Sequence, residues 1–146
     1  MLRMGSRSAT ELLQLSVRLH GIRLGQPVDV LLDSAEWRAL GFVVLCGDGS
    51  LRFLAFAAVT PRDDALELAS AFLLLEDLGF YRERSRSLRA LLGGSVVNGG
   101  SELGELRDLL VDPGGSVETL VVEGDGGIRE VRPEGLTVGA EHVSPA

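Results

Sequence analysis

The sequence contains no lysine, and its 14 basic residues are all arginine. Aspartate and glutamate together number 21, so the formal net charge is −7 at pH 7. Domains that bind nucleic acid normally present a basic surface that displaces counterions from the phosphate backbone. The charge balance therefore argues against direct contact with nucleic acid and leaves another protein as the expected kind of partner.

Cysteine and long apolar segments are also scarce. Cys46 is the only cysteine, which excludes an internal disulfide, and its place in the apolar run 42–46 predicts a small buried side chain rather than a reactive thiol. No leader-like apolar stretch opens the chain. The longest uncharged segment, 90–101, has 12 residues, whereas a membrane span needs about 20. We therefore expect a cytoplasmic protein without a membrane span.

Residues that could carry chemistry are few. His20 and His142 are the only histidines, and neither lies at a recognisable metal-ligand spacing from other histidine, cysteine or carboxylate side chains. No motif brings a serine or the cysteine together with a base and an orienting acid. We therefore predict no catalytic residue, no metal and no cofactor, and we expect that the chain is not an enzyme.

Glycine, by contrast, is abundant, with 19 residues, and this favours many tight turns over long helices. Residues 11–20 alternate between apolar and polar side chains and predict a half-buried strand. Two apolar runs flank the turn 47–50, which predicts a β-hairpin over 40–59. Segment 69–80 fits a strand or a helix. Short strands with turns at intervals of about ten residues predict a mainly β barrel or sandwich.

The second part of the chain repeats features of the first. Leu24-Gly25 is echoed by Leu92-Gly93 and Leu40-Gly41 by Leu103-Gly104, at offsets between 63 and 68 residues. Conserved order with drifting loop lengths is typical of a duplicated fold. The sequence therefore predicts two packed halves, joined by a short helical or irregular linker.

The predicted boundaries are a flexible tail over 1–10, a first half over 11–80, an Arg-rich linker over 81–90, a second half over 91–140 and a flexible tail over 141–146. The first half has an apolar hairpin with few charges, which is typical of strands buried on both faces. We therefore expect it to pack against the second half or another subunit, and a homodimer through this apolar surface is a secondary prediction.

The repeated order of Leu-Gly-x-(Pro/Ser)-Val, Leu-Gly, a strand, an Asp-Gly or Pro-Gly turn and an apolar strand resembles the PRC-barrel family. The second half is the clearer match, because 92–123 follows the family's run from its opening Leu-Gly to its central hairpin. The first half is similar only at 24–28 and 40–41. The resemblance implies two small PRC-barrel-like β-barrel halves in a binding or adaptor protein, and it brings no catalytic residues.

One basic cluster, residues 81–89, is the candidate binding site. Four arginines against one glutamate can bind phosphate or acidic groups through their forked donors, or form a solvated linker paired with the acidic excess elsewhere. The lone Tyr81 and the lone Trp37 are candidates as ligand platforms, although each is expected more as part of the core. The candidate binding residues are Arg82, Arg84, Arg86, Arg89, Tyr81 and Trp37.

These observations predict a non-enzymatic, protein-binding adaptor or scaffold built on PRC-barrel-like domains. The alternative is a ribosome- or RNA-processing-associated factor that docks through the Arg-rich linker, by analogy with a ribosome-maturation factor that carries this barrel. The partner of such a factor could be a basic ribosomal protein, which the acidic charge of the chain would favour.

Overall fold

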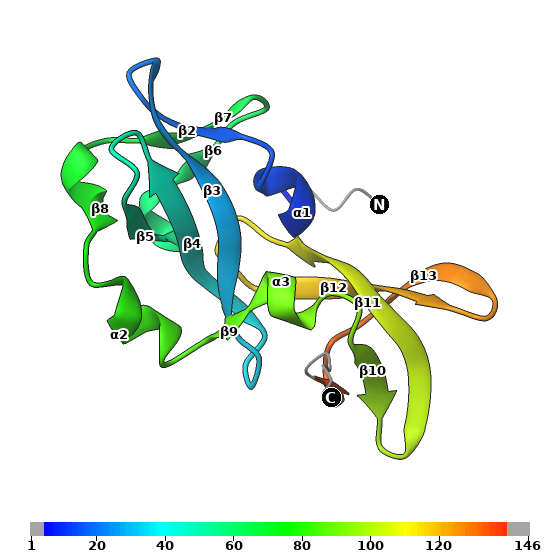
Figure 1. The fold of residues 1–146 in the computed structure, drawn as a ribbon. Coiled ribbons are helices and arrows are strands. Elements are labelled where there is room, and N and C mark those ends of the chain that lie inside the picture. The colour runs from blue at the N-terminus through cyan, green and yellow to red at the C-terminus, as the bar shows by residue number, and fades with distance from the viewer. Residues whose placement is uncertain (1–4, 140–146) are drawn as a thin grey trace.

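The computed structural model describes residues 5–139 and is mainly β, as the sequence predicts (Figure 1). Two curled sheets, one from each part of the chain, pack on a shared core. The elements in chain order are β1 (Arg7–Ser8), α1 (Ala9–Leu12), β2 (Ser16–Leu19), β3 (Ile22–Asp33), β4 (Arg38–Cys46), β5 (Leu51–Ala55), β6 (Thr60–Pro61), β7 (Ala65–Leu68), β8 (Leu74–Leu75), α2 (Leu78–Arg82), β9 (Arg86–Ser87), α3 (Leu88–Leu91), β10 (Ser95–Asn98), β11 (Ser101–Val111), β12 (Val117–Gly124), β13 (Gly127–Val131) and β14 (Leu136–Val138), with two 3-10 turns at Phe56–Ala58 and Ala71–Leu73.

The first sheet has the strand order β6-β7-β2-β3-β4-β5-β8, and the second has the order β13-β12-β11-β10-β14. The predicted hairpin over 40–59 is confirmed over 40–55 as β4 and β5, which pair from Leu45 with Leu51 to Gly41 with Ala55. Its returning strand ends earlier than predicted, because 56–58 form a 3-10 turn. The turn of the hairpin is closed by Ser50, whose backbone N and Oγ donate to Asp48 Oδ1 at 3.0 and 2.6 Å. The Asp-Gly turn signal therefore predicts this hairpin for the correct physical reason.

The two halves share the order of their first elements, but at a different offset from the predicted one. β1, α1 and β2 begin 79 residues before β9, α3 and β10, so that Leu24-Gly25 corresponds to Leu103-Gly104 and not to Leu92-Gly93. Both glycines lie against a neighbouring strand: a Cβ would stand 2.6 Å from Leu45 O at Gly25 and 2.3 Å from Glu123 O at Gly104. A Cβ at Gly93 would meet nothing within 4 Å. The dipeptide alone could not distinguish these environments.

The two halves exchange their first elements. β1 belongs to the first half but pairs with β11 of the second sheet, and β9, from the second half, pairs with β3 of the first sheet. In Figure 1, α1 accordingly lies beside β11 and α3 lies beside β3. The paired positions are Arg7 with Val111, Ser8 with Leu110, Arg86 with Leu32 and Ser87 with Leu31, and each pair matches its counterpart at the 79-residue offset.

One aspartate in each half holds the exchanged element. Ser8 Oγ donates to Asp108 Oδ2, and Thr10 N donates to Asp108 Oδ1 at 3.1 Å. In the other half Ser87 Oγ donates to Asp29 Oδ2, and Arg89 N donates to Asp29 Oδ1 at 3.1 Å. Both serines also cap the helical turn that follows them. The carboxylates therefore satisfy donors at the start of a helical turn contributed by the other half.

A second reciprocal contact joins the halves. The backbone N of Ala39 donates to Gly115 O at 2.7 Å, and the backbone N of Val117 donates to Trp37 O at 2.8 Å. These bonds flank an antiparallel bridge between Arg38 and Ser116. At the 79-residue offset Ser116 corresponds to Trp37, the neighbour of Arg38, so corresponding segments of the two halves meet, as they do about an approximate twofold axis.

Residues 7–10 correct the prediction of a flexible tail over 1–10, because they form β1 and the start of α1. Ala9 is 1% exposed. The predicted strand over 11–20 is confirmed only for β2, since its first residues continue α1. A two-residue strand and one helical turn are too short to leave a periodic pattern. The predicted tail over 141–146 lies outside the described residues.

The apolar outer face of the first sheet is covered by its own chain. The segment 69–80, left undecided by the sequence, and the start of the predicted linker contain β8, which pairs with β5 at the edge of the sheet, and α2, which lies over the outer face. Leu78 of α2 buries Leu31, Val43 and Phe53 in a second small core. The other face of the hairpin packs with the second half in the shared core, as expected, whereas the outer face is covered without another subunit. The homodimer remains a prediction, without this face to support it.

Replacing either Asp29 or Asp108 by alanine is expected to lower the free energy of unfolding by about 2–3 kcal/mol, because a serine hydroxyl and a helix N–H lose their acceptor. The two losses should be similar, since the two carboxylates make equivalent contacts. Urea denaturation measures both, with Asp125→Ala in the exposed β12–β13 turn as the control. If either variant loses no more stability than the control, the carboxylate does not hold the exchanged element in place.

Gly41→Ala is expected to cost about 2–3 kcal/mol of stability by overpacking. A Cβ at this position would lie 2.4 Å from the backbone oxygen of Leu54 and 2.5 Å from the ring of Phe53, and the backbone oxygen cannot rotate away. Gly79→Ala on α2 is the matched control, because nothing lies within 4 Å of its added Cβ. The urea midpoint should fall for Gly41→Ala only, and equal midpoints would show that the sheet relaxes around the methyl group.

Candidate functional site

The Arg-rich segment is built from α2, β9 and α3 and lies along the outer side of the first sheet. Tyr81 stacks on Phe53, with ring centroids 3.8 Å apart and an angle of 7° between the rings. The ring of Phe53 is thus enclosed between Tyr81 and Gly41 on the sheet below. Tyr81 therefore serves to fasten α2 to the sheet, which leaves only part of its ring accessible.

Two of the four candidate arginines are engaged within the chain. Arg84 lies 3.7 Å above the ring of Phe80 and donates through Nη1 to Phe80 O at 2.8 Å. Arg89 donates through Nε to Val28 O, so its side chain is tied to β3. Such contacts hold a guanidinium in place and use part of its donors.

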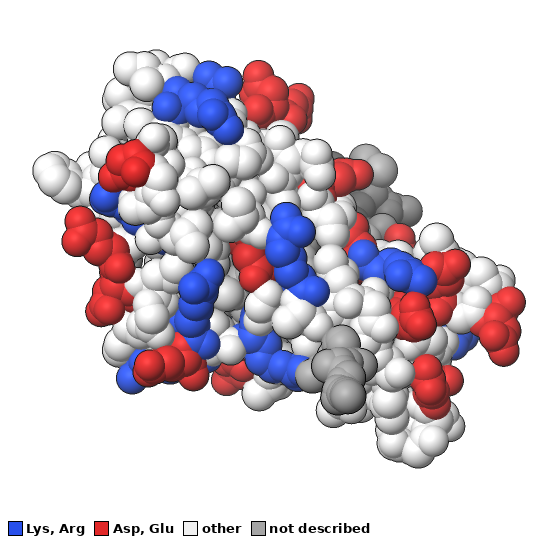
Figure 2. All heavy atoms as spheres, viewed as in Figure 1, with Lys and Arg blue, Asp and Glu red and all other residues white. Residues whose placement is uncertain are grey.

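Arg82 is exposed and Arg86 half-buried, and neither side chain forms an ion pair or hydrogen bond with the described residues. Arg86 and Arg84 line a shallow groove together with Asp33 and Glu83. In Figure 2 the face over α2, β9 and α3 shows blue and red side chains beside one another. The structure thus brings the candidate arginines to one face, but it mixes them with carboxylates.

Trp37 lies away from the Arg-rich segment, at the junction of the two halves. Its side chain is 8% exposed, its φ is +55°, and its carbonyl accepts the hydrogen bond from Val117. It borders an open groove whose other wall is the segment 133–137. The structure therefore does not bring Trp37 together with Tyr81 and the arginines.

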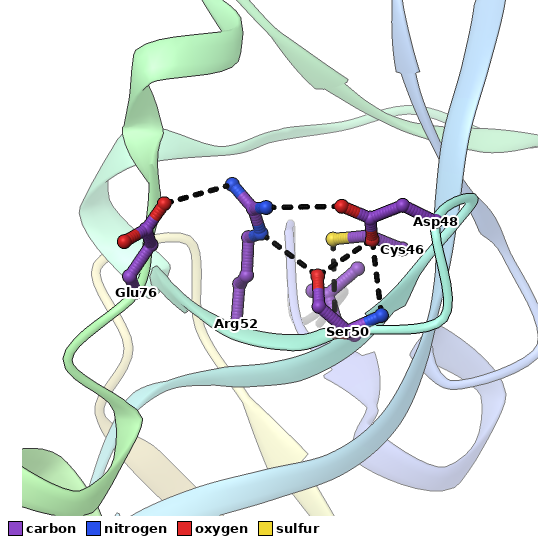
Figure 3. Close-up of polar contacts among 6 residues, drawn as sticks. Cys46, Asp48, Ser50, Arg52 and Glu76 are labelled. Atoms are coloured by element: carbon purple, nitrogen blue, oxygen red, sulfur yellow. Dashed lines mark hydrogen bonds and ion pairs between the residues drawn. The ribbon is translucent and has the colours of Figure 1, made fainter.

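A polar network surrounds the β4–β5 turn (Figure 3). Arg52 lies between two carboxylates, with Nη2 at 3.2 Å from Asp48 Oδ2 and Nη1 at 3.8 Å from Glu76 Oε2. Its Nε donates to Ser50 Oγ at 3.0 Å. Hydrogen bonds from Ser50, with a smaller contribution from Arg52, lower the pKa of the Asp48 carboxyl. The network therefore fixes the turn and links β5 to β8.

Cys46 stands at the base of this network, half-buried beside the core. Its Sγ donates to Val44 O at 3.9 Å. Burial is the largest influence on this thiol and raises its pKa, while Arg52 acts in the opposite direction. The sulfur is therefore held as a neutral thiol, which agrees with the prediction of a small apolar side chain.

Sequence reasoning placed 128–132 in the second half but did not single out the edge strand β13 as a candidate site. Among residues 5–139 it pairs with β12 alone and ends the second sheet, and its first four residues are exposed. Ile128, its second residue, is 67% exposed. The sequence signal was weak, because Gly127–Val131 carries two charges within five residues and resembles an ordinary solvated hairpin arm.

Two further findings concern the part of the chain that the structure describes. Within residues 5–139, no three histidine, cysteine or carboxylate side chains come together as they would to hold a metal ion. No helix among the described residues is long and apolar enough to cross a membrane.

The raised pKa of Cys46 predicts slow alkylation by iodoacetamide near neutral pH. A free thiol has a pKa of about 8.5, and the thiolate is the reacting form. Because the folded thiol ionises at higher pH than the unfolded one, the native rate at pH 7.5 should be lower than the rate in urea. The same shift makes the free energy of unfolding fall as the pH rises above about 8.5. Equal rates in the native and unfolded states would contradict the shielding of the sulfur.

The comparisons with known proteins add no relative to these observations. No protein-family model matches the chain, and no curated protein matches it either.

Proposed function

We propose that this chain is a non-enzymatic cytoplasmic adaptor, built on two PRC-barrel-like halves, that binds another protein along the outer edge of β13. The observation that carries the proposal is a strand at the end of its sheet on which the apolar side chain of Ile128 is exposed. An edge strand can be extended by a segment of another protein that adds to it as a further strand.

The geometry of β13 suits strand addition. The strand is paired along its full length with β12, from Leu120 with Val131 to Gly124 with Gly127. No proline interrupts Gly127–Val131. Ile128 offers an apolar contact beside the outer edge, and burial of such a side chain is worth about 1.5–3 kcal/mol.

The charge around this edge indicates the kind of partner. Segment 91–139 contains nine carboxylates and three arginines, a net charge of −6. Figure 2 shows this end of the molecule, formed by the β10–β13 hairpins, with more red than blue. A basic extended segment would be steered toward such a surface. We therefore infer that the partner presents an arginine- or lysine-rich strand.

Further support comes from the roles of the polar groups and from the family resemblance. Asp29, Asp48 and Asp108 accept hydrogen bonds that close caps and a turn, which are structural tasks. Gly25 and Gly104, the glycines of the Leu-Gly dipeptides, hold equivalent positions in the two halves. This equivalence supports the proposal that both halves are PRC-barrel-like and that the fold serves as a scaffold.

The test is affinity capture of the tagged full chain from its own cells with Ile128→Lys. A matched control is available, because Ile22 on β3 is 66% exposed and Ile22→Lys makes the same change of charge and apolar area. Loss of one apolar contact and of favourable charge should reduce recovery of the partner about tenfold, equivalent to ~1.4 kcal/mol. Circular dichroism should show both variants folded.

The control variant should recover the partner at the level of the unmodified chain. Equal recovery by both variants would place the interface elsewhere and would overturn the role of β13. Loss of recovery with Ile22→Lys alone would move the interface to the tip of the β2–β3 hairpin.

A second candidate function is a ribosome- or RNA-associated factor that docks through the Arg-rich segment. It is favoured by Arg82 and Arg86, whose side chains have no ion pair or hydrogen bond among the described residues. The same capture with and without nuclease separates the two functions. This candidate would be supported if ribosomal proteins are captured but are lost after nuclease treatment. They should also be lost when Arg82→Ala and Arg86→Ala are introduced together. A nuclease-resistant partner that both arginine variants retain would support the adaptor.

A further inference from the structure

The exchanged elements form two equivalent binding surfaces. We call residues 7–12 the N-terminal arm and residues 86–91 the internal arm; each is an extended Arg-Ser pair followed by one helical turn. The N-terminal arm contacts β11 at Asp108 and the internal arm contacts β3 at Asp29. Each arm reaches the other half through a connection of only three residues, 13–15 or 92–94.

The two surfaces recognise their arms by the same contacts. In each case the serine hydroxyl donates to the aspartate, and it accepts a hydrogen bond at 3.2 Å from the backbone N three residues further on. The arginine and serine pair with the neighbouring strand in the same register. The last residue of each arm, Leu12 or Leu91, is a fully buried leucine. The arginines pair through their backbones, so the side-chain contacts that the two arms share require only the pattern Ser-x-x-x-Leu.

The residue after the serine is buried in both arms, but its side chain differs in size between them. Ala9 is 1% exposed in the N-terminal arm, and Leu88 is 0% exposed at the equivalent place in the internal arm. A leucine has three more carbon atoms than an alanine, and a packed core accommodates added volume poorly. The Asp108 surface therefore fits a small residue at this position, whereas the Asp29 surface fits a large one.

We propose that the Asp108 surface is a peptide-recognition site for a helical turn that begins with serine, and that the size of the residue after the serine decides which arm it accepts. The occupant in this chain is its own N-terminal arm. Its kind of partner in trans is a segment Ser-Ala-x-x-Leu, such as the N-terminal arm of a second copy. The internal arm carries Leu88 and is excluded, so each arm docks on one surface only. This site is separate from the β13 edge and does not depend on the proposed function.

The test adds peptides to the full chain carrying Ser8→Ala and Leu12→Ala, which weaken its own arm. Three peptides are compared by the midpoint of thermal unfolding: residues 5–15, residues 84–94, and residues 84–94 with Leu88→Ala. A ligand that binds the folded state raises the midpoint in proportion to the logarithm of its concentration. Residues 5–15 and the Leu88→Ala peptide should raise the midpoint by several degrees, and the native 84–94 peptide should not.

An equal rise with the two 84–94 peptides would overturn the size selection. No rise with any peptide would overturn the recognition site itself. A second experiment needs no weakened arm: Ala9→Leu in the otherwise native chain is compared with Glu11→Leu, an exposed position on the same helical turn. Ala9→Leu should lower the midpoint by several degrees and Glu11→Leu should leave it unchanged. A native midpoint for Ala9→Leu would show that the site accepts leucine and would contradict the proposal.

Discussion

Two half-buried carboxylates organise this molecule, because each captures a helical turn supplied by the other half. Asp29 and Asp108 accept a serine hydroxyl and a backbone N–H from segments that lie far away in sequence. The interface between the halves is therefore held by hydrogen bonds of defined direction in addition to apolar contact. A half of about 60 residues buries too little surface to be more than marginally stable alone. The exchange adds the missing surface to both halves at once.

The halves have the same plan but different outer faces. In the first half the outer face of β3, β4 and β5 is apolar and is covered by α2, while β8 extends the sheet beside β5. The same face of the second half carries Arg107 between Glu105 and Glu123, with N to O distances of 2.9 and 2.7 Å, and meets solvent. The segment that follows β5 thus shields the apolar outer face of the first half from solvent. The charged outer face of the second half needs no such shielding.

Local patterns predicted what local physics determines. The β4–β5 hairpin followed from an Asp-Gly turn between apolar runs. The repeat offset could not be derived in this way, because Leu-Gly occurs at several places. Gly41 lies against a neighbouring strand just as Gly25 and Gly104 do, so the dipeptide alone does not show which two glycines are equivalent. The two arms could not be predicted for a different reason. A two-residue strand and one helical turn leave no periodic pattern, and they are held in place by an aspartate that lies far away in sequence.

The exchanged arms also bear on how the chain is synthesised. Arg7 of β1 pairs with Val111, so β1 can join its sheet only after more than a hundred further residues have been synthesised. β3 can pair with β9 only after more than fifty further residues have been synthesised, a shorter delay than that of β1. At about 5–20 residues per second, Asp29 and the adjoining strand edge stay uncovered for several seconds. During translation the incompletely paired first sheet is therefore accessible to chaperones and to neighbouring chains. The order of synthesis thus affects how the chain folds.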